Sequence, residues 1–418
     1  MKQKKKGTKF YMLLAAVLFV IVAATAVIAK FGGGEFFHNY GENFKKNAAV
    51  IANKLPQGMK DMFAKPTQEP AQEPSQEEEK STSTIGDAQG AANMTEGGAA
   101  KLLPLENAGT ARYARYKDSV VCASQAGLTA FDLSGKILWT VPQTIVEPIL
   151  DTADKYILLA EKGGKKVSLF SGNKLIYTQD TENAIITASI SENGDVVVVT
   201  EKPYYKGAVI VYNKDGKQVF VWNSGSSDIM DADISSAGRK VAVAMLNTDH
   251  GTFSTISFFD LTGAEPEGSH DFDDTLVFDV DFLGETLNVV ADNKIVGLNT
   301  KGKELFSTDY NGKKLSKYSL ETSGLKALMF DNSSYAEVAF LDNRGRSKLS
   351  IKSEEIPDFV DLYAGMVAYN TGQGVVFGSI SGKDLKLYRS NKGVKNALIV
   401  STQCVMVIYS SSVEFVTF

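Results

Sequence analysis

The sequence predicts an all-β protein built from seven or eight copies of a four-stranded unit, with eight favoured, and two observations lead to this prediction. A nine-residue phrase recurs in which a strand end leads through Asp or Asn to Gly and then to an aromatic residue four positions later. Its clear copies occupy residues 131–139, 212–220 and 298–306. Between the copies the chain reads as short β-branched runs with two-residue alternation, and no helical stripe follows residue 105. A repeat of this kind without helices is typical of a β-propeller.

The glycine of each copy defines the length of the repeat. A short hairpin loop with a bulge needs one residue at positive φ, and Gly adopts that conformation without steric cost. Looser copies occupy residues 169–174, 259–263 and 341–345, and a weaker one occupies residues 387–393. Successive turn glycines lie 37 to 48 residues apart, close to the period of four-stranded blades at about 40–50 residues. They are Gly135, Gly172, Gly216, Gly263, Gly302, Gly345 and Gly393.

The two ends of the repeat region predict how the ring closes. Residues 412–418 look like one more third strand that has no fourth strand after it. Residues 102–106 precede the first full blade and would supply the missing strand. Closure with strands from both ends removes exposed sheet edges. We therefore favour eight blades, and an unclosed set of seven is the alternative.

Aromatic residues and cysteines fall at repeated blade positions. Trp139, Phe220 and Phe306 share one position, and we expect them to pack between blades rather than to stack on a ligand. Cys122 and Cys404 fall on the second strands of the first and last blades, which are neighbours in a closed ring. We expect two free, buried thiols, and a disulfide across the closure is the alternative.

The N-terminal segment predicts a membrane anchor. A basic tail at residues 1–9 carries five lysines and precedes an uncharged run within residues 10–30. About 20 apolar residues span the hydrocarbon core as a helix, and the lysines place the N-terminus in the cytoplasm and the rest outside. The lipid bilayer is thus an expected partner of residues 10–30. A cleaved signal peptide is the alternative.

Two further segments separate the predicted span from the repeats. Residues 35–56 form a predicted amphipathic helix that either lies on the membrane surface or pairs with another helix. Its apolar face consists of Phe37, Tyr40, Phe44, Ala48, Ile51 and Leu55. Residues 66–100 are acidic and contain proline, which predicts a disordered linker. The propeller is predicted over residues 102–418.

The sequence contains no recognisable catalytic or cofactor motif. It has three histidines, whereas a Ser–His–Asp triad or a Cys–His pair requires a positioned one. His250 sits in a turn-like segment, and neither a nucleophile elbow nor a phosphate-binding loop occurs. The formal charge of −5 argues against nucleic acid, which requires a basic face. We therefore predict no catalytic residue, no cofactor and no nucleic-acid partner.

Two aspartate pairs are the strongest candidate site. Asp231 with Asp233, and Asp279 with Asp281, occupy the same place in successive repeats, on the predicted innermost strands. Period-two alternation places each pair opposite the apolar side chains. Four polar residues lie just upstream of the second pair: His270, Asp271, Asp273 and Asp274. The pairs are candidates for a hard-cation site, and the favoured alternative is a structural role in accepting backbone hydrogen bonds.

The phrase resembles the quinoprotein-type (PQQ-type, WD-like) propeller repeat, in which a strand ending in Asp leads through a Gly turn to a Trp. Residues 131–139, with Asp132, Gly135 and Trp139, are the closest copy, and the resemblance covers about residues 105–418. It implies an architecture. Redox members carry a quinone site, often with adjacent cysteines, which this chain lacks, so the cofactor is not carried over. The layout also resembles an uncharacterised family of single-pass propeller proteins from Gram-positive bacteria.

These features together predict a function in the cell envelope. We expect a membrane-anchored, extracytoplasmic propeller that acts as a non-catalytic binding or scaffold module for an envelope protein, because function in propellers lies on their loops. One alternative is an enzyme that uses a quinone or carboxylates in the channel. Another is a ligand sensor that signals through residues 35–56.

Overall fold

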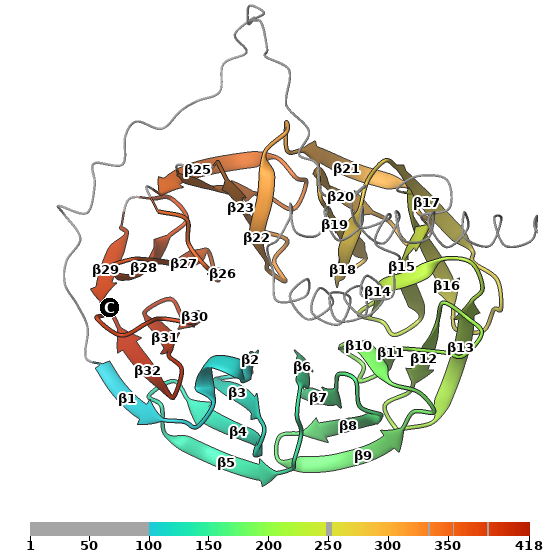
Figure 1. Cartoon of the computed structure of the whole chain (residues 1–418), viewed down its shortest axis with the longest axis horizontal. Coiled ribbons are helices and arrows are strands. Elements are labelled where there is room, and N and C mark those ends of the chain that lie inside the picture. Colours follow the sequence, from blue (N-terminus) through green and yellow to red (C-terminus); the bar gives the residue numbers. More distant parts are fainter. Residues whose placement is uncertain (1–99, 248–252, 333–334, 354, 383) are drawn as a thin grey trace, which may run out of the picture. The chain divides into compact units, whose positions relative to one another are not determined.

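The described part of the chain forms an eight-bladed β-propeller, which confirms the favoured blade number (Figure 1). The computed structural model describes residues 100–247, 253–332, 335–353, 355–382 and 384–418. Each blade is a four-stranded antiparallel sheet.

The predicted N-terminal segments fall outside these residues. They are the tail 1–9, the membrane span 10–30, the amphipathic helix 35–56 and the linker 66–100, of which only Ala100 is described. Among the described residues, no helix has the length and apolar character needed to cross a membrane.

The strands of each blade follow one another along the chain, from the innermost to the outermost. Blades 1 to 4 comprise β2 Arg112–Tyr116, β3 Ser119–Ser124, β4 Gly127–Asp132 and β5 Ile137–Pro142; β6 Pro148–Ala153, β7 Tyr156–Glu161, β8 Lys166–Ser171 and β9 Lys174–Asp180; β10 Ile185–Ile190, β11 Val196–Thr200, β12 Gly207–Tyr212 and β13 Gln218–Ser224; and β14 Asp228–Ile234, β15 Lys240–Asn247, β16 Phe253–Asp260 and β17 Gly268–Asp273. Blades 5 to 8 comprise β18 Val277–Leu283, β19 Thr286–Ala291, β20 Lys294–Leu298 and β21 Glu304–Asp309; β22 Lys314–Leu320, β23 Lys326–Asp331, β24 Ala336–Leu341 and β25 Ser347–Ser353; β26 Val360–Tyr363, β27 Met366–Thr371, β28 Gly374–Ser379 and β29 Lys386–Arg389; and β30 Asn396–Ser401, β31 Cys404–Ile408, β32 Ser412–Thr417 and β1 Ala100–Pro104.

The two ends of the propeller meet in blade 8, as predicted. Strand β1 pairs antiparallel with β32, so that Ala100 lies opposite Val416 and Pro104 opposite Ser412. A short 3-10 turn, η3 Ala108–Thr110, then leads into blade 1. Because β1 begins at Ala100, the propeller starts two residues before the predicted position 102. Closure leaves β32 as a third strand whose fourth strand comes from the other end of the chain.

The recurrent phrase forms the hairpin between the third and fourth strands. In the first copy, Oδ1 of Asp132 accepts the backbone amides of Ser134 at 2.9 Å and Lys136 at 2.8 Å. Gly135 then takes a φ of 75°. Three other copies place an Asp or Asn oxygen on the amides two and four residues later: Asn213, Asn299 and Asp342. The conserved chemistry of the phrase is therefore a side-chain acceptor that satisfies turn amides.

Two of the predicted turn glycines, Gly263 and Gly393, do not occupy the positive-φ position of such a hairpin. Gly263 lies in a longer loop and has no positive φ. Gly393 lies in the connection between β29 and β30, because the segment read as a third strand is the fourth strand β29. The equivalent turn residue of blade 7 is Gly382, at φ 71°, whose amide bonds the Ser379 carbonyl at 2.9 Å. Residues 379–382 carry Ser in place of Asp, which hid the copy.

The hairpins at Gly216 and Gly345 pack on the outermost strand of the preceding blade. A Cβ on Gly216 would lie 2.8 Å from the Tyr177 ring, and Gln179 donates to the Gly216 carbonyl at 2.9 Å. Thr308 donates likewise to the Gly345 carbonyl at 2.7 Å.

The repeated aromatic position lies between blades, as predicted. Trp139 packs in a cluster that spans blades 1 and 2, and Phe220 in one that spans blades 3 and 4. Phe306 lies against Gly345 of the next blade.

The cysteines belong to the closure. Cys122 on β3 and Cys404 on β31 are both free and buried in one apolar cluster shared by blades 1 and 8. Burial raises the pKa of Cys122 to about 12. The expected pair of free thiols is confirmed, and neither is a reactive nucleophile.

Substitutions at two turn glycines distinguish the cost of backbone strain from the cost of steric overlap between blades. Gly216→Ala and Gly172→Ala both place a side chain at positive φ, at 83° and 58°, which costs roughly 1–2 kcal/mol. Only the Cβ at position 216 meets a neighbour, since position 172 has nothing within 4 Å. We expect Gly216→Ala to lower the free energy of unfolding by about 1 kcal/mol more than Gly172→Ala. Equal losses in urea denaturation would contradict the described packing.

Candidate functional site

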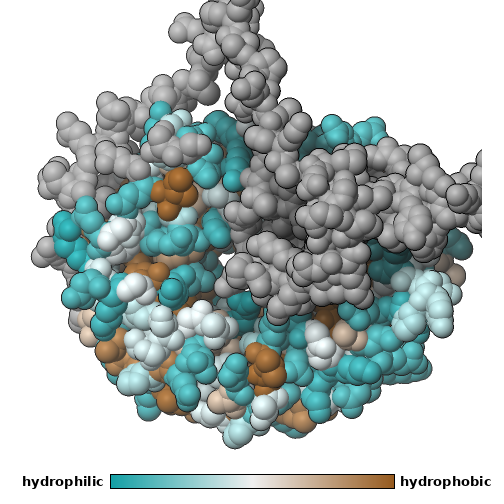
Figure 2. Space-filling view, viewed as in Figure 1, coloured by the Kyte–Doolittle hydropathy of each residue, from teal (hydrophilic) through white to brown (hydrophobic). Residues whose placement is uncertain are grey.

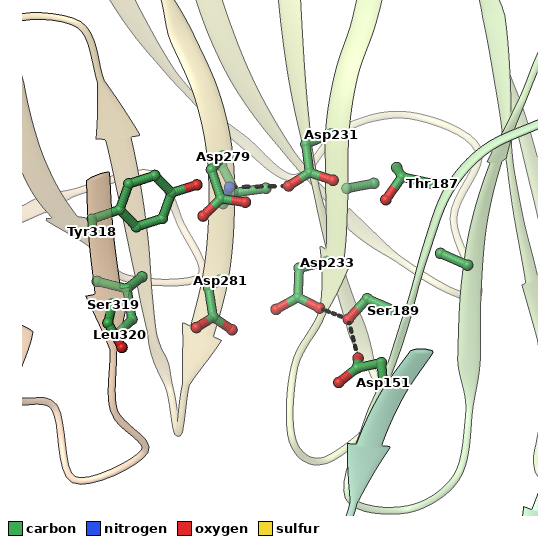
Figure 3. A pocket seen from close by; sticks show the side chains of 13 residues that line it. Asp151, Thr187, Ser189, Asp231, Asp233, Asp279, Asp281, Tyr318, Ser319 and Leu320 are labelled. Carbon is green, nitrogen blue, oxygen red and sulfur yellow. Dashed lines mark hydrogen bonds between the residues drawn. The ribbon is translucent and has the colours of Figure 1, made fainter. Parts of the chain in front are cut away.

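A cavity of about 370 Å³ opens at the centre of the ring, between the innermost strands of blades 2 to 6. It contains both predicted aspartate pairs, and a fifth aspartate joins them (Figure 3). The lining residues are Asp151, Thr187, Ala188, Ser189, Asp231, Ala232, Asp233, Asp279, Val280, Asp281, Tyr318, Ser319 and Leu320. Among the described residues, no Lys, Arg or His lines it. Apart from the Tyr318 hydroxyl, every ionisable group that lines the cavity is therefore a carboxyl group.

Asp231 and Asp233 on β14 hold the next blade in place. Oδ2 of Asp231 accepts the amide of Val280 at 3.1 Å, and Oδ2 of Asp233 accepts the amide of Phe282 at 2.6 Å. Along an edge strand every second amide points away from its own sheet, so these amides of an innermost strand need a partner from outside the sheet. The favoured structural interpretation is confirmed for this first pair.

The same contact recurs around the ring. Asp151 on β6 accepts the amide of Ile190 at 3.1 Å, and Asp361 on β26 accepts the amide of Ile399 at 2.6 Å. The hydroxyl of Ser319 on β22 accepts the amide of Leu362 at 3.0 Å. An acceptor on one innermost strand thus bonds an amide on the next.

Asp279 and Asp281 on β18 depart from this pattern. The Asp279 carboxylate lies between the Tyr318 ring and Asp231 at the wall of the cavity (Figure 3) and accepts no backbone amide among the described residues. Asp281 points into the cavity (Figure 3), and no group in the described part of the chain donates a hydrogen bond to its carboxylate. The second pair therefore does not bind the next blade through its backbone.

Asp151 is the site residue that sequence reasoning missed. Ser189 joins it to the predicted set, because its hydroxyl lies 3.2 Å from Oδ2 of Asp151 and 2.5 Å from Oδ1 of Asp233. Asp151 stands alone on its strand, without the second acidic residue that made the other two strands recognisable. Its place on the innermost strand of blade 2 is the only signal that pointed to it.

The polar residues upstream of Asp279 do not reach the cavity. His270, Asp271 and Asp273 lie on β17, the outermost strand of blade 4, and Asp274 follows it. Nδ1 of His270 lies 3.0 Å from the carbonyl of Gly302 in the next blade. They lie near Asp279 in the sequence but not in space, because this short segment connects the outermost strand of blade 4 to the innermost strand of blade 5. His250 lies outside the described residues.

The electrostatics of the cavity favour protonated carboxyls. Burial raises the pKa of Asp233 to about 7. Burial, followed by the charge of Asp279, raises the pKa of Asp231 well above its ordinary value. Burial, followed by the charge of Asp233, does the same to Asp281. Burial also raises the pKa values of Asp151 and Asp279. Removal of the carboxylates from water accounts for this direction at all five aspartates, and like charges add to it at Asp231, Asp233 and Asp281.

The arrangement does not match a metal centre. No group of three or more His, Cys, Asp or Glu side chains in the described part of the chain is placed to hold a metal ion. The carboxylates instead surround a cavity. A hard-cation site at Asp231, Asp233, Asp279 and Asp281 stays a prediction from the sequence.

These raised pKa values predict how stability depends on pH. The folded protein retains protons that the unfolded chain loses above a pKa of about 4, so stability falls as pH rises, by up to about 1.4 kcal/mol per pH unit for each retained proton. Asp281→Asn removes one such group without breaking a described hydrogen bond. We expect its melting temperature to fall less between pH 5 and pH 8 than that of the natural protein.

Asp118→Asn provides the matched control, because Asp118 is an exposed turn residue between β2 and β3. It makes the same chemical change outside the cavity and should keep the natural dependence on pH. If all three proteins lose stability equally between pH 5 and pH 8, Asp281 does not carry a raised pKa.

Solved structures with low sequence identity share this fold. Sqt1 of Saccharomyces cerevisiae is 11% identical with a TM-score of 0.56, over 78% of this chain and 100% of that one. The computationally designed Ika8 protein is 15% identical with a TM-score of 0.57, over 75% of this chain and 98% of that one. The β-propeller domain of Cps50 (Swd1) from Myceliophteria thermophila is 10% identical with a TM-score of 0.50, over 67% of this chain and 97% of that one. At such identities the likeness concerns the fold alone.

Sequence comparison identifies a family without an assigned activity. No curated protein matches the chain. The model of a family of unknown function, DUF5711, matches residues 99–418, which is most of the chain and includes the whole propeller, and the protein therefore belongs to that family.

Proposed function

We propose that this protein is a non-catalytic binding module of the cell envelope. In this proposal residues 10–30 anchor it in the membrane, the propeller lies on the extracytoplasmic side, and its outer edge holds a protein partner. The observation that carries the proposal is an uneven distribution of exposed apolar side chains among the outermost strands.

The exposed apolar residues gather on four adjacent blades. The outermost strands β1, β5, β9 and β13 belong to blades 8, 1, 2 and 3, and they follow one another along the edge of the ring (Figure 1). Seven large apolar side chains on them are between 38% and 56% exposed. We call these the apolar rim: Leu102, Ile137, Leu138, Leu175, Ile176, Val219 and Val221.

The other half of the edge differs. Among the described residues, the outermost strands β17, β25 and β29 contribute no large exposed apolar side chain, and β21 contributes Leu305. The visible part of the ring face in Figure 2 is mainly hydrophilic, with apolar residues in separate spots. Exposed apolar groups scattered singly are ordinary, whereas a gathered set indicates a contact surface.

Two of the four rim strands also lack the charged residues that usually protect sheet edges, whereas β1 contains Lys101 and β9 contains Lys174 and Asp180. Strands β5 and β13 contain no charged residue, whereas β25 carries two lysines. Charged residues on an edge strand normally prevent pairing with another chain. The open edges of β5 and β13 therefore suit an extended, uncharged segment of a partner protein that adds as a further strand.

Cysteine labelling in intact cells tests the compartment and the rim in one experiment. Leu138→Cys lies on the rim, and Leu305→Cys is an equally exposed position outside it, at 50% and 54%. The natural cysteines are buried and remain silent. With a membrane-impermeant maleimide we expect Leu305→Cys to react in cells as fast as in purified protein. Leu138→Cys should react at least several-fold more slowly in cells, because the partner covers it.

The two parts of the proposal, the extracytoplasmic location and the partner on the apolar rim, can be contradicted separately. If Leu305→Cys reacts only after the cells are opened, the extracytoplasmic location is wrong. If Leu138→Cys reacts in intact cells as fast as Leu305→Cys does, no partner covers the rim and the binding role assigned to it is wrong.

A further inference from the structure

The eight innermost strands do not pack on one another evenly. Neighbouring strands lie in close contact at six joints of the ring. The two exceptions are the joint between β30 and β2, where blade 8 meets blade 1, and the joint between β18 and β22, where blade 5 meets blade 6. At these two joints the innermost strands run farther apart than at the other six, and side chains lie between them; at the second, the ring centroids of Phe278 and Tyr318 are 6.0 Å apart.

A guanidinium group fills the first of these joints. Nε of Arg115 on β2 donates to the carbonyl of Ile399 on β30 at 2.6 Å. Its Nη2 forms an ion pair with Asp361 on β26, and the group lies over the Tyr363 ring at 4.4 Å. One side chain from blade 1 thereby links blades 8 and 7. A delocalised cation with several N–H donors is suited to carboxylate, carbonyl and aromatic partners at once.

The second joint offers comparable partners without a cation. Asp279 and Asp281 lie on one side of it, and Tyr318 lies on the other (Figure 3). Asp281 is mostly buried, points into the cavity and accepts no hydrogen bond from the described residues. The two joints thus share carboxylate and tyrosine, but only the first contains the positive group.

We propose that the cavity at this second joint binds an organic cation, a guanidinium or primary ammonium group, through the carboxylates of Asp279 and Asp281. Three observations select this class of ligand. The carboxylates line a space of about 370 Å³, the size of a small-molecule pocket. No three His, Cys, Asp or Glu side chains of the described residues are placed together as a metal site requires. A group with several N–H donors can bond separated acceptors at once, as Arg115 does with the Ile399 carbonyl and the Asp361 carboxylate at the other joint.

The proposal goes beyond the apolar rim and does not depend on it. Such a cation has two possible sources, a free small molecule or the Lys or Arg side chain of a partner protein that enters the channel. The chemistry that the cavity recognises is the same for both, so the experiment distinguishes them.

Calorimetric titration of the full-length protein in detergent, at pH 7.5 and constant ionic strength, provides the test. The probes are agmatine, which carries a guanidinium and an ammonium group, and tetramethylammonium, which carries charge without N–H donors. We expect agmatine to bind and tetramethylammonium not to bind. Binding should release protons, seen as a dependence of the measured heat on the buffer, because burial raises the pKa values of Asp279 and Asp281 and a bound cation favours their ionised forms.

Three variants show whether the proposed residues are responsible. We expect Asp279→Asn and Asp281→Asn each to weaken agmatine binding at least tenfold, and Asp118→Asn to leave it unchanged. Both cavity variants replace a carboxylate with an amide of nearly the same size, and an unchanged melting temperature at pH 5 confirms that they fold.

The outcomes decide between the proposal and its rivals. Tighter binding of a capped Gly-Arg-Gly peptide than of agmatine supports a partner side chain as the source, and the reverse order supports a free cation. The proposal is overturned if agmatine does not bind, or if it binds the Asp279→Asn and Asp281→Asn variants as tightly as the natural protein. It is also overturned if calcium binds and agmatine does not, since the cavity would then be a metal site.

Discussion

The hydrogen bond from an innermost-strand amide to an acceptor side chain on the preceding blade is the constraint on which the centre of this propeller depends. Each innermost strand pairs with its own sheet on one side only, and a buried amide without a partner costs about 1–3 kcal/mol. Asp151, Asp231, Asp233, Asp361 and Ser319 meet this need at four of the eight joints, between blades 2 and 3, 4 and 5, 6 and 7, and 7 and 8. The same solution crowds carboxylates into the channel, so the acidity of the centre follows from how the ring is held together.

Two of the eight joints depart from close packing, and they differ in charge. Arg115 neutralises one of them with a group from the chain itself. At the other, Asp279 and Asp281 face a cavity that no basic side chain of the described residues lines. The propeller therefore has two separate features suited to recognition: an acidic cavity at its centre and uncharged, apolar strands on part of its edge. Their separation allows one partner to use both, or two partners to bind independently.

The fold was readable from the sequence because its determinants are local. The Asp or Asn acceptor and the Gly at positive φ occur within four residues of one another, so each copy predicts its own hairpin without information from the rest of the chain. The copy of the phrase in blade 7 was not recognised because Ser replaces Asp ahead of Gly382. Gly393 was assigned to this turn instead. The site was only partly readable. Paired aspartates marked β14 and β18, but Asp151 has no such pair, and the loose joint between β18 and β22 depends on contacts between segments that the linear pattern does not connect.

The channel carboxyls have no counter-charge among the described residues, and a carbon-13 NMR titration of the aspartate carboxyls in the full-length protein tests this most directly. With the signals of Asp281 and Asp118 assigned through their Asn variants, the account predicts that the pKa of Asp281 lies well above the ordinary aspartate value of about 3.9. An Asp281 carboxyl that ionises in the ordinary range, in protein free of added cations, would contradict the account, because some group of the chain would then already neutralise it.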